Sequence, residues 1–139
     1  MFCMCCKFED NRGKQMNVNN GGFFAGIDGF LEDADKDAVT NTRKVLFSAW
    51  QGLTDQSPVD QGTFKGNWMM TVNGLSAETS EKVGAQPFPD VAFKMGDAIF
   101  LSNALPYALR IESGWSPMAP QGVVGPTRRA LILELQKND

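Results

Sequence analysis

The sequence predicts a small α+β domain in which a long N-terminal helix and a C-terminal helix pack on one face of a small antiparallel sheet, with projecting loops. Three patterns predict this fold. Apolar residues recur with helical spacing over 31–54, alternate with polar residues over 64–72, and recur with helical spacing again over 123–137. Because 139 residues suit one domain, we expect a flexible polar tail at 1–22 and a single domain at 23–139.

The helix predicted over 31–54 has a core-facing stripe and two aromatic residues outside it. The stripe consists of Leu31, Ala34, Ala38, Thr42, Val45, Ala49 and Leu53. Phe47 projects from the opposite, charged side, and Trp50 lies at the edge of the stripe. Both are candidate contacts with a partner, although single exposed aromatic residues are also ordinary on protein surfaces. The helix should end before Ser57-Pro58, because proline disfavours the α conformation of the residue that precedes it.

A strand with one buried face is predicted over 64–72 from its alternating pattern. Trp68 belongs to the apolar set of this strand, so we expect its side chain to be buried. Asn73-Gly74 follows directly and is the strongest short signal for a hairpin, so it should close the strand. The polar segment 75–83 fits either a strand or a short helix.

The segment 84–90 contains two prolines, which cannot donate the hydrogen bonds of a strand ladder. It is therefore predicted to be an extended, projecting loop with Phe88 at its tip as a candidate partner contact. Residues 91–94 and 98–103 are strand candidates, and the second is apolar on both faces, as a central strand would be. The sheet is expected to have three or four antiparallel strands.

Proline and glycine mark the elements that follow. Pro106 suits the start of a short helix over 107–112, and Gly114 suits its end. A proline-rich loop follows over 115–122, in which Trp115 is a candidate partner contact. We expect the two proline-containing corners to hold these loops in fixed positions.

The closing helix over 123–137 has a core face and a basic pair. Its core face is formed by Val124, Thr127, Leu131 and Leu135. Arg128 and Arg129 point elsewhere, and we regard them as candidate contacts with an acidic neighbouring subunit.

Charge and composition exclude several classes of function. The chain has 13 Lys and Arg against 16 Asp and Glu, a net charge of -3, whereas proteins that bind nucleic acid through its phosphates usually have a basic surplus. It contains no histidine, which removes Ser-His-Asp and Cys-His catalytic sets and His-ligated zinc. No apolar run is long enough to span a membrane. We therefore expect no enzymatic activity, no cofactor, no bound metal and no membrane association.

The three cysteines, Cys3, Cys5 and Cys6, contain a C-x-x-C spacing. A zinc site needs a second ligand pair and a redox motif needs a following helix, and the sequence offers neither, so we expect these cysteines to lie in a poorly ordered terminus. A small metal-binding or enzymatic protein that uses them, with carboxylates such as Glu78 and Glu81, is the weaker alternative.

Two segments resemble motifs of a known family. Residues 57–68, SPVDQGTFKGNW, are similar to the motif SPVDTGxFRxxW of tailed-phage neck and tail-completion proteins, which include lambda-type minor tail proteins. Residues 103–124 resemble the family's NxxPYAxxLExGxSxxAPxGMV, with small departures at Gln61, Ile111 and Val123. We interpret the motif residues as scaffold at corners and loops: Pro58, Asp60, Gly62, Trp68, Pro106, Tyr107, Glu112, Gly114, Pro120 and Gly122.

The resemblance implies a structural virion protein at the head–tail junction, assembled in the bacterial cytoplasm. Such proteins form homo-oligomeric rings, mostly six-fold, that complete the tail or join it to the head connector and leave a channel for double-stranded DNA. The implied partners are copies of the chain itself, neighbouring connector and tail proteins, and DNA that passes without sequence-specific binding. A tail terminator that caps the tube is the nearest alternative. A DNA-binding accessory protein is disfavoured by the acidic balance.

Overall fold

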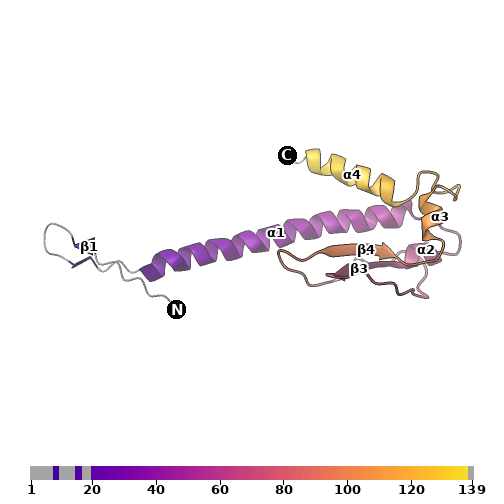
Figure 1. Ribbon diagram of the computed structural model, residues 1–139. Helices are drawn as coiled ribbons and strands as arrows, with labels where there is room; N and C mark the ends of the chain where they lie inside the picture. The colour runs from indigo at the N-terminus through magenta and orange to yellow at the C-terminus, as the bar shows by residue number, and fades with distance from the viewer. Residues whose placement is uncertain (1–7, 10–14, 17–19, 138–139) are drawn as a thin grey trace. The chain divides into compact units, whose positions relative to one another are not determined.

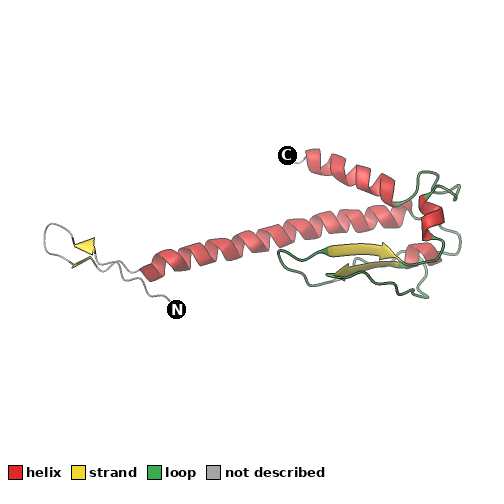
Figure 2. Cartoon of the chain, in the orientation of Figure 1, coloured by secondary structure: helices red, strands yellow, loops and turns green. Residues whose placement is uncertain are grey.

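Long helices and a two-stranded antiparallel sheet form an α+β fold, as the sequence predicts (Figures 1 and 2). The computed structural model of the chain describes residues 8–9, 15–16 and 20–137. The elements are β1 (Phe8–Glu9), β2 (Gln15–Met16), α1 (Asn20–Gln56), α2 (Thr63–Gly66), β3 (Trp68–Val72), β4 (Ile99–Asn103), α3 (Ala108–Glu112) and α4 (Val124–Lys137). The chain divides into two compact units, residues 1–36 and 37–139.

In the first unit, β1 pairs with β2 in antiparallel fashion, with Phe8 opposite Met16. Helix α1 begins at Asn20, so the predicted start of the helix at residue 31 is wrong. Glycines interrupt the apolar pattern of residues 21–29, and this hides the helical signal from periodicity alone. The three cysteines, whose position in a terminal tail was predicted, lie outside the described residues.

In the second unit, β3 pairs with β4 from Trp68 opposite Asn103 to Val72 opposite Ile99. The part of α1 from residue 37 onward and helix α4 lie on the same side of this sheet, with α1 next to it (Figure 1). The buried core contains Trp50, Leu53, Phe64, Trp68, Met70, Ile111, Ala119 and Val123. Helix α4 approaches α1 where Gly52 faces Thr127: a Cβ at Gly52 would lie 2.7 Å from the Thr127 methyl group.

The predicted strand over 64–72 is helical at its start and extended only from Trp68. Gly62 adopts a φ of +78° and its carbonyl accepts a hydrogen bond from the Gly66 N–H at 3.0 Å, which closes the turn of α2. The predicted burial of Trp68 is confirmed, since its side chain is 6% exposed. The alternating pattern marked the right buried residue but could not show that a tight turn precedes the strand.

The turn signal Asn73-Gly74 ends β3, but the predicted hairpin is wrong. Asn73 has a φ of +58°, and its backbone N–H donates to the Ala98 carbonyl at 2.7 Å, just before β4. Its side-chain amide donates to the Asp97 carboxylate and holds the pKa of Asp97 below its ordinary value, together with the Lys94 N–H. A long connection therefore separates the paired strands.

That connection is kept out of the sheet by Asn67, which is 1% exposed. The Asn67 amide donates to the carbonyl oxygens of Thr63 and Ser80, and its oxygen accepts from the Ser80 N–H at 2.7 Å. Residues 91–94 form no strand either, because the Val91 carbonyl accepts a hydrogen bond from Arg43 of α1. In the described part of the second unit the sheet thus has two strands, where three or four were predicted.

The segment 84–90 does not project with Phe88 at its tip, which corrects the prediction. The Trp50 indole donates to the Gln86 carbonyl at 3.0 Å, and the Phe88 ring makes edge contacts with both Trp50 and Phe47. Arg43 adds an ion pair with Asp90 at 3.2 Å. Prolines keep this segment out of the ladder, while aromatic packing and hydrogen bonds fold it back onto α1.

The C-terminal elements agree with the sequence prediction within one residue. Helix α3 ends at Glu112, and α4 begins at Val124. Of the predicted core face of α4, Thr127 is buried, whereas Val124 and Leu135 are about half exposed. In the described residues, no helix combines the length and the apolar character that crossing a bilayer requires.

Candidate interaction groove

The first corner, between α1 and α2, is built around the hydroxyl of Ser57. This hydroxyl donates to the Leu53 carbonyl at 2.5 Å and accepts from the Trp68 indole N–H at 2.8 Å. Ser57, Pro58 and Trp68 are all buried. One serine therefore satisfies both a carbonyl at the end of α1 and the single N–H donor of a buried indole. This double role explains why a serine and a tryptophan stand at this spacing in the motif.

Two glycines in this corner allow close backbone approach. A Cβ at Gly62 would lie 2.8 Å from a methyl group of Val83 and 2.9 Å from the Gly84 nitrogen, and the residue has a positive φ. A Cβ at Gly66 would overlap the Lys82 carbonyl. The scaffold role predicted for Gly62 thus has a steric basis. Gly66 was not singled out from the sequence, although it stands inside the first motif.

The second corner, between β4 and α3, is tied directly to the first. The Asn103 side-chain amide donates to the Phe64 carbonyl at 2.9 Å, so the end of β4 is fixed to α2. Pro106 is exposed at the start of the turn. The Tyr107 ring lies 6.2 Å from the Phe64 ring, centroid to centroid, so Tyr107, predicted as a scaffold residue, packs against α2.

Glu112, interpreted from the sequence as a scaffold residue, holds the start of α4. Its carboxylate accepts hydrogen bonds from the backbone N–H groups of Val123, Val124 and Gly125 at 2.8, 2.9 and 3.0 Å. Partial burial raises the pKa of Glu112, but these three donors outweigh it, so the pKa lies below the ordinary value of 4.5. A carboxylate bound to the free N–H groups of a first helical turn is a strong cap.

The loop between α3 and α4 is closed by two further motif glycines. Gly114 has a φ of +84°, and a Cβ there would overlap the Pro120 carbonyl. Gly122 has a φ of +80°, and a Cβ there would lie 2.9 Å from a carboxylate oxygen of Glu112. Only glycine fits either position without displacing backbone or the cap. The loop that carries Trp115 is therefore held at both ends.

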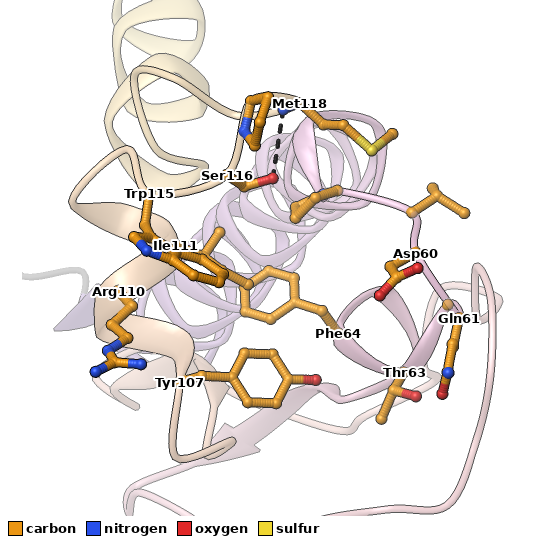
Figure 3. Close-up of a pocket in the computed structure, with 14 residues that line it drawn as sticks. Asp60, Gln61, Thr63, Phe64, Tyr107, Arg110, Ile111, Trp115, Ser116 and Met118 are labelled. Carbon is orange, nitrogen blue, oxygen red and sulfur yellow. Dashed lines mark hydrogen bonds between the residues drawn. The ribbon is translucent and has the colours of Figure 1, made fainter.

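The two motif segments meet and line one open groove of about 620 Å³ (Figure 3). Its lining comes from residues 58–64 and from 107, 110, 111 and 115–118. Phe64 and Ile111 are buried beneath it, while Val59, Trp115 and Met118 are exposed around it. The structure thus brings two segments that are far apart in the sequence onto one largely apolar surface.

The two ends of the groove differ in charge (Figure 3). Arg110 lies beside Trp115, with its guanidinium 6.0 Å from the centre of the indole ring. Asp60 lies at the other end, next to Gln61 and Thr63. Asp60 and Tyr107 were interpreted from the sequence as scaffold residues. The structure shows that both line the groove.

The residues predicted to contact partners are not all at the surface. Trp50 is 5% exposed and its ring and N–H are occupied within the chain, so its predicted role as a partner contact is wrong. Phe47 is half exposed, and Phe88 is half buried against it. Arg128 and Arg129 are exposed on α4, where Arg129 donates to the Gln121 side chain.

Among the predicted contacts, Trp115 lies in the groove, but sequence reasoning missed its neighbours. Val59, Arg110 and Met118 line the groove and were not chosen. They belong to the motif segments or to the proline-rich loop before α4, and that position in the sequence is the signal that could have found them.

In the described residues, no group of three or more Cys, Asp or Glu side chains is arranged to hold a metal ion. Comparisons of the chain with protein-family models, with curated proteins and with solved structures give no significant match.

Proposed function

We propose that this chain is a non-enzymatic structural subunit of the head–tail junction of a tailed phage, where copies form a ring that completes the tail or joins it to the head connector. The observation that carries this proposal is the convergence of the two motif segments on one exposed apolar groove. Residues 57–68 and 103–124 are also the segments that resemble the family of neck and tail-completion proteins.

The composition of the groove supports a protein partner. Tryptophan, tyrosine, methionine and arginine are enriched where proteins bind one another, and the groove presents Trp115, Tyr107, Met118 and Arg110. The polar motif residues Ser57 and Glu112 act within the scaffold. Ser57 bonds to a backbone carbonyl and to the Trp68 indole, and the Glu112 carboxylate accepts hydrogen bonds from backbone N–H groups. The motifs thus hold a surface in shape, which is what a subunit of an assembly requires.

A closed ring needs two different surfaces on each subunit, because each copy binds one neighbour with one face and the other neighbour with another. The groove supplies one such surface. The net charge of -3 per chain gives a ring an overall negative charge, which opposes adhesion of DNA to the channel.

The proposal is tested on the purified full chain by light scattering after size exclusion and by negative-stain electron microscopy. We expect a concentration-dependent assembly of several copies, seen as rings with a central hole. Binding to double-stranded DNA should be weak and should not change steeply with salt. A chain that stays monomeric up to millimolar concentration, or that binds DNA tightly at physiological salt, would contradict the proposal.

A further inference from the structure

Among the described residues, the first part of α1 presents an exposed apolar face. Ile27, Phe30, Leu31 and Ala34 follow the spacing i, i+3, i+4 and i+7, so they lie on one side of the helix. Phe30 is 71% exposed and Leu31 is 55% exposed. We call these four residues the α1 stripe. Helices that present such a face bind apolar grooves through residues at this spacing.

The helix that carries the α1 stripe is weak by composition. Gly22, Gly26 and Gly29 each disfavour a helix by about 1 kcal/mol relative to alanine. A Cβ at any of the three would meet no other atom within 4 Å, so close packing against the described residues does not explain these glycines. Most helices in proteins are stabilised by packing of their apolar face, and among the described residues this face stays exposed and open to a partner molecule.

The flanks of the α1 stripe are acidic. Asp28 and Asp35 lie along one edge and Asp33 and Asp37 along the other, at about 100° per residue. Lys36 is the single basic residue of this stretch, and it already pairs with Glu32 and Asp33. A partner surface should therefore be apolar with a cation beside it.

One end of the groove has that composition, whereas Asp60 lies at the other end. Phe64, Ile111, Trp115 and Met118 form its apolar part, and the exposed guanidinium of Arg110 lies beside Trp115. We propose that the α1 stripe of one copy docks into the groove of the next copy, with the Asp28 and Asp35 edge toward Arg110. This inference rests on the proposed self-association and identifies the second surface of the subunit contact.

Two single variants and their mixture test the proposal. Leu31→Asp damages the α1 stripe and leaves the groove intact, and Trp115→Asp does the reverse. Because both side chains are mostly exposed, both variants should fold, which circular dichroism checks. We expect each variant alone to be monomeric, with self-association weakened about a hundredfold or more. An equimolar mixture should form dimers, since one intact stripe and one intact groove remain.

Leu75→Asp is the matched control, because Leu75 is 73% exposed and belongs to neither surface. It should assemble like the wild type. If Leu31→Asp also assembles like the wild type, or if the mixture of the two variants stays monomeric, the docking proposal is overturned while ring formation by the wild type stands. If the wild type itself never assembles, the proposed function fails.

Photocrosslinking tests the contact even where association is weak. With p-benzoylphenylalanine at position 115 and isotopically labelled second copies, we expect an intermolecular crosslink to a peptide that contains Leu31. A crosslink confined to any other segment overturns the proposal. Charge reversal tests the orientation: Arg110→Glu should weaken association about tenfold, and Asp28→Lys with Asp35→Lys in the neighbouring copy should restore it. Lys94→Glu, elsewhere on the surface, should change association little.

Discussion

The two corners around the groove and the first part of α1 are stabilised by different means. At the corners, Ser57, Asn67, Asn103 and Glu112 each bond to backbone or to a buried indole, and glycines allow backbone to pass close by. In α1 up to Lys36, the ion pairs of Lys36 are exposed, and so are the side chains of Ile27, Phe30 and Leu31. The comparison contrasts a region held by buried hydrogen bonds and close backbone packing with a region whose described large apolar side chains are exposed.

The largest effect on stability is expected from Trp68→Ala. This change empties a buried site and leaves the Ser57 hydroxyl without its donor, so the free energy of unfolding should fall by roughly 3–5 kcal/mol. Urea denaturation measures it. Trp115→Ala, the same change at an exposed position, should alter the free energy of unfolding by less than about 0.5 kcal/mol. Equal losses in the two variants would remove the distinction between scaffold and surface.

Gly66→Ala should have the next largest effect. The new Cβ would overlap the Lys82 carbonyl, and backbone must move, at a cost of about 1–3 kcal/mol. Gly74→Ala is the control, because a Cβ at Gly74 meets nothing within 4 Å. Thermal unfolding of both variants makes the comparison. A Gly66→Ala variant as stable as the wild type would show that the loop over residues 80–84 does not pack closely against α2.

Glu112→Gln should cost about 1–2 kcal/mol, since the charged cap of α4 is lost. It should also change the pH dependence of stability. The pKa of Glu112 is lower in the folded chain than its ordinary value of 4.5, so its contribution is complete above that value and is lost as the pH falls through the folded pKa. Wild type should therefore lose stability more steeply than Glu112→Gln below about pH 4.5.

The pH dependence of the free energy of unfolding is measured by urea denaturation at several pH values between 3 and 7. Glu134→Gln, a change at an exposed carboxyl of α4, should follow the wild type. Parallel pH profiles for the wild type and Glu112→Gln would contradict the capping role.

The smallest effect on the isolated chain is expected from Leu31→Ser. Leu31 is exposed, so the free energy of unfolding of the monomer should change by less than about 0.5 kcal/mol. Measurement at a protein concentration below that of assembly avoids a contribution from the proposed subunit contact. A loss of about 2 kcal/mol or more would show that the α1 stripe is packed within its own chain and would end the contrast between the two regions.

The sequence by itself determined the α+β class, the approximate bounds of α3 and α4, the end of α1 before Ser57-Pro58 and the burial of Trp68. These follow from local rules: helical and alternating periodicity, and the restrictions that proline and glycine place on the backbone. The cap at Glu112 joins residues 11 to 13 positions apart, so it lies beyond the reach of these local rules.

Only the tertiary structure decided which segments pair and what the motifs present. β3 pairs with β4 and not through a hairpin at Asn73-Gly74, and Asn67 binds the intervening segment at Ser80. Trp50, predicted at the surface, is buried, and the Phe88 ring packs against it. The groove likewise depends on the bond from Asn103 to Phe64. Each of these interactions joins residues distant in sequence, which periodicity and turn chemistry do not encode, since both act over a few neighbouring residues.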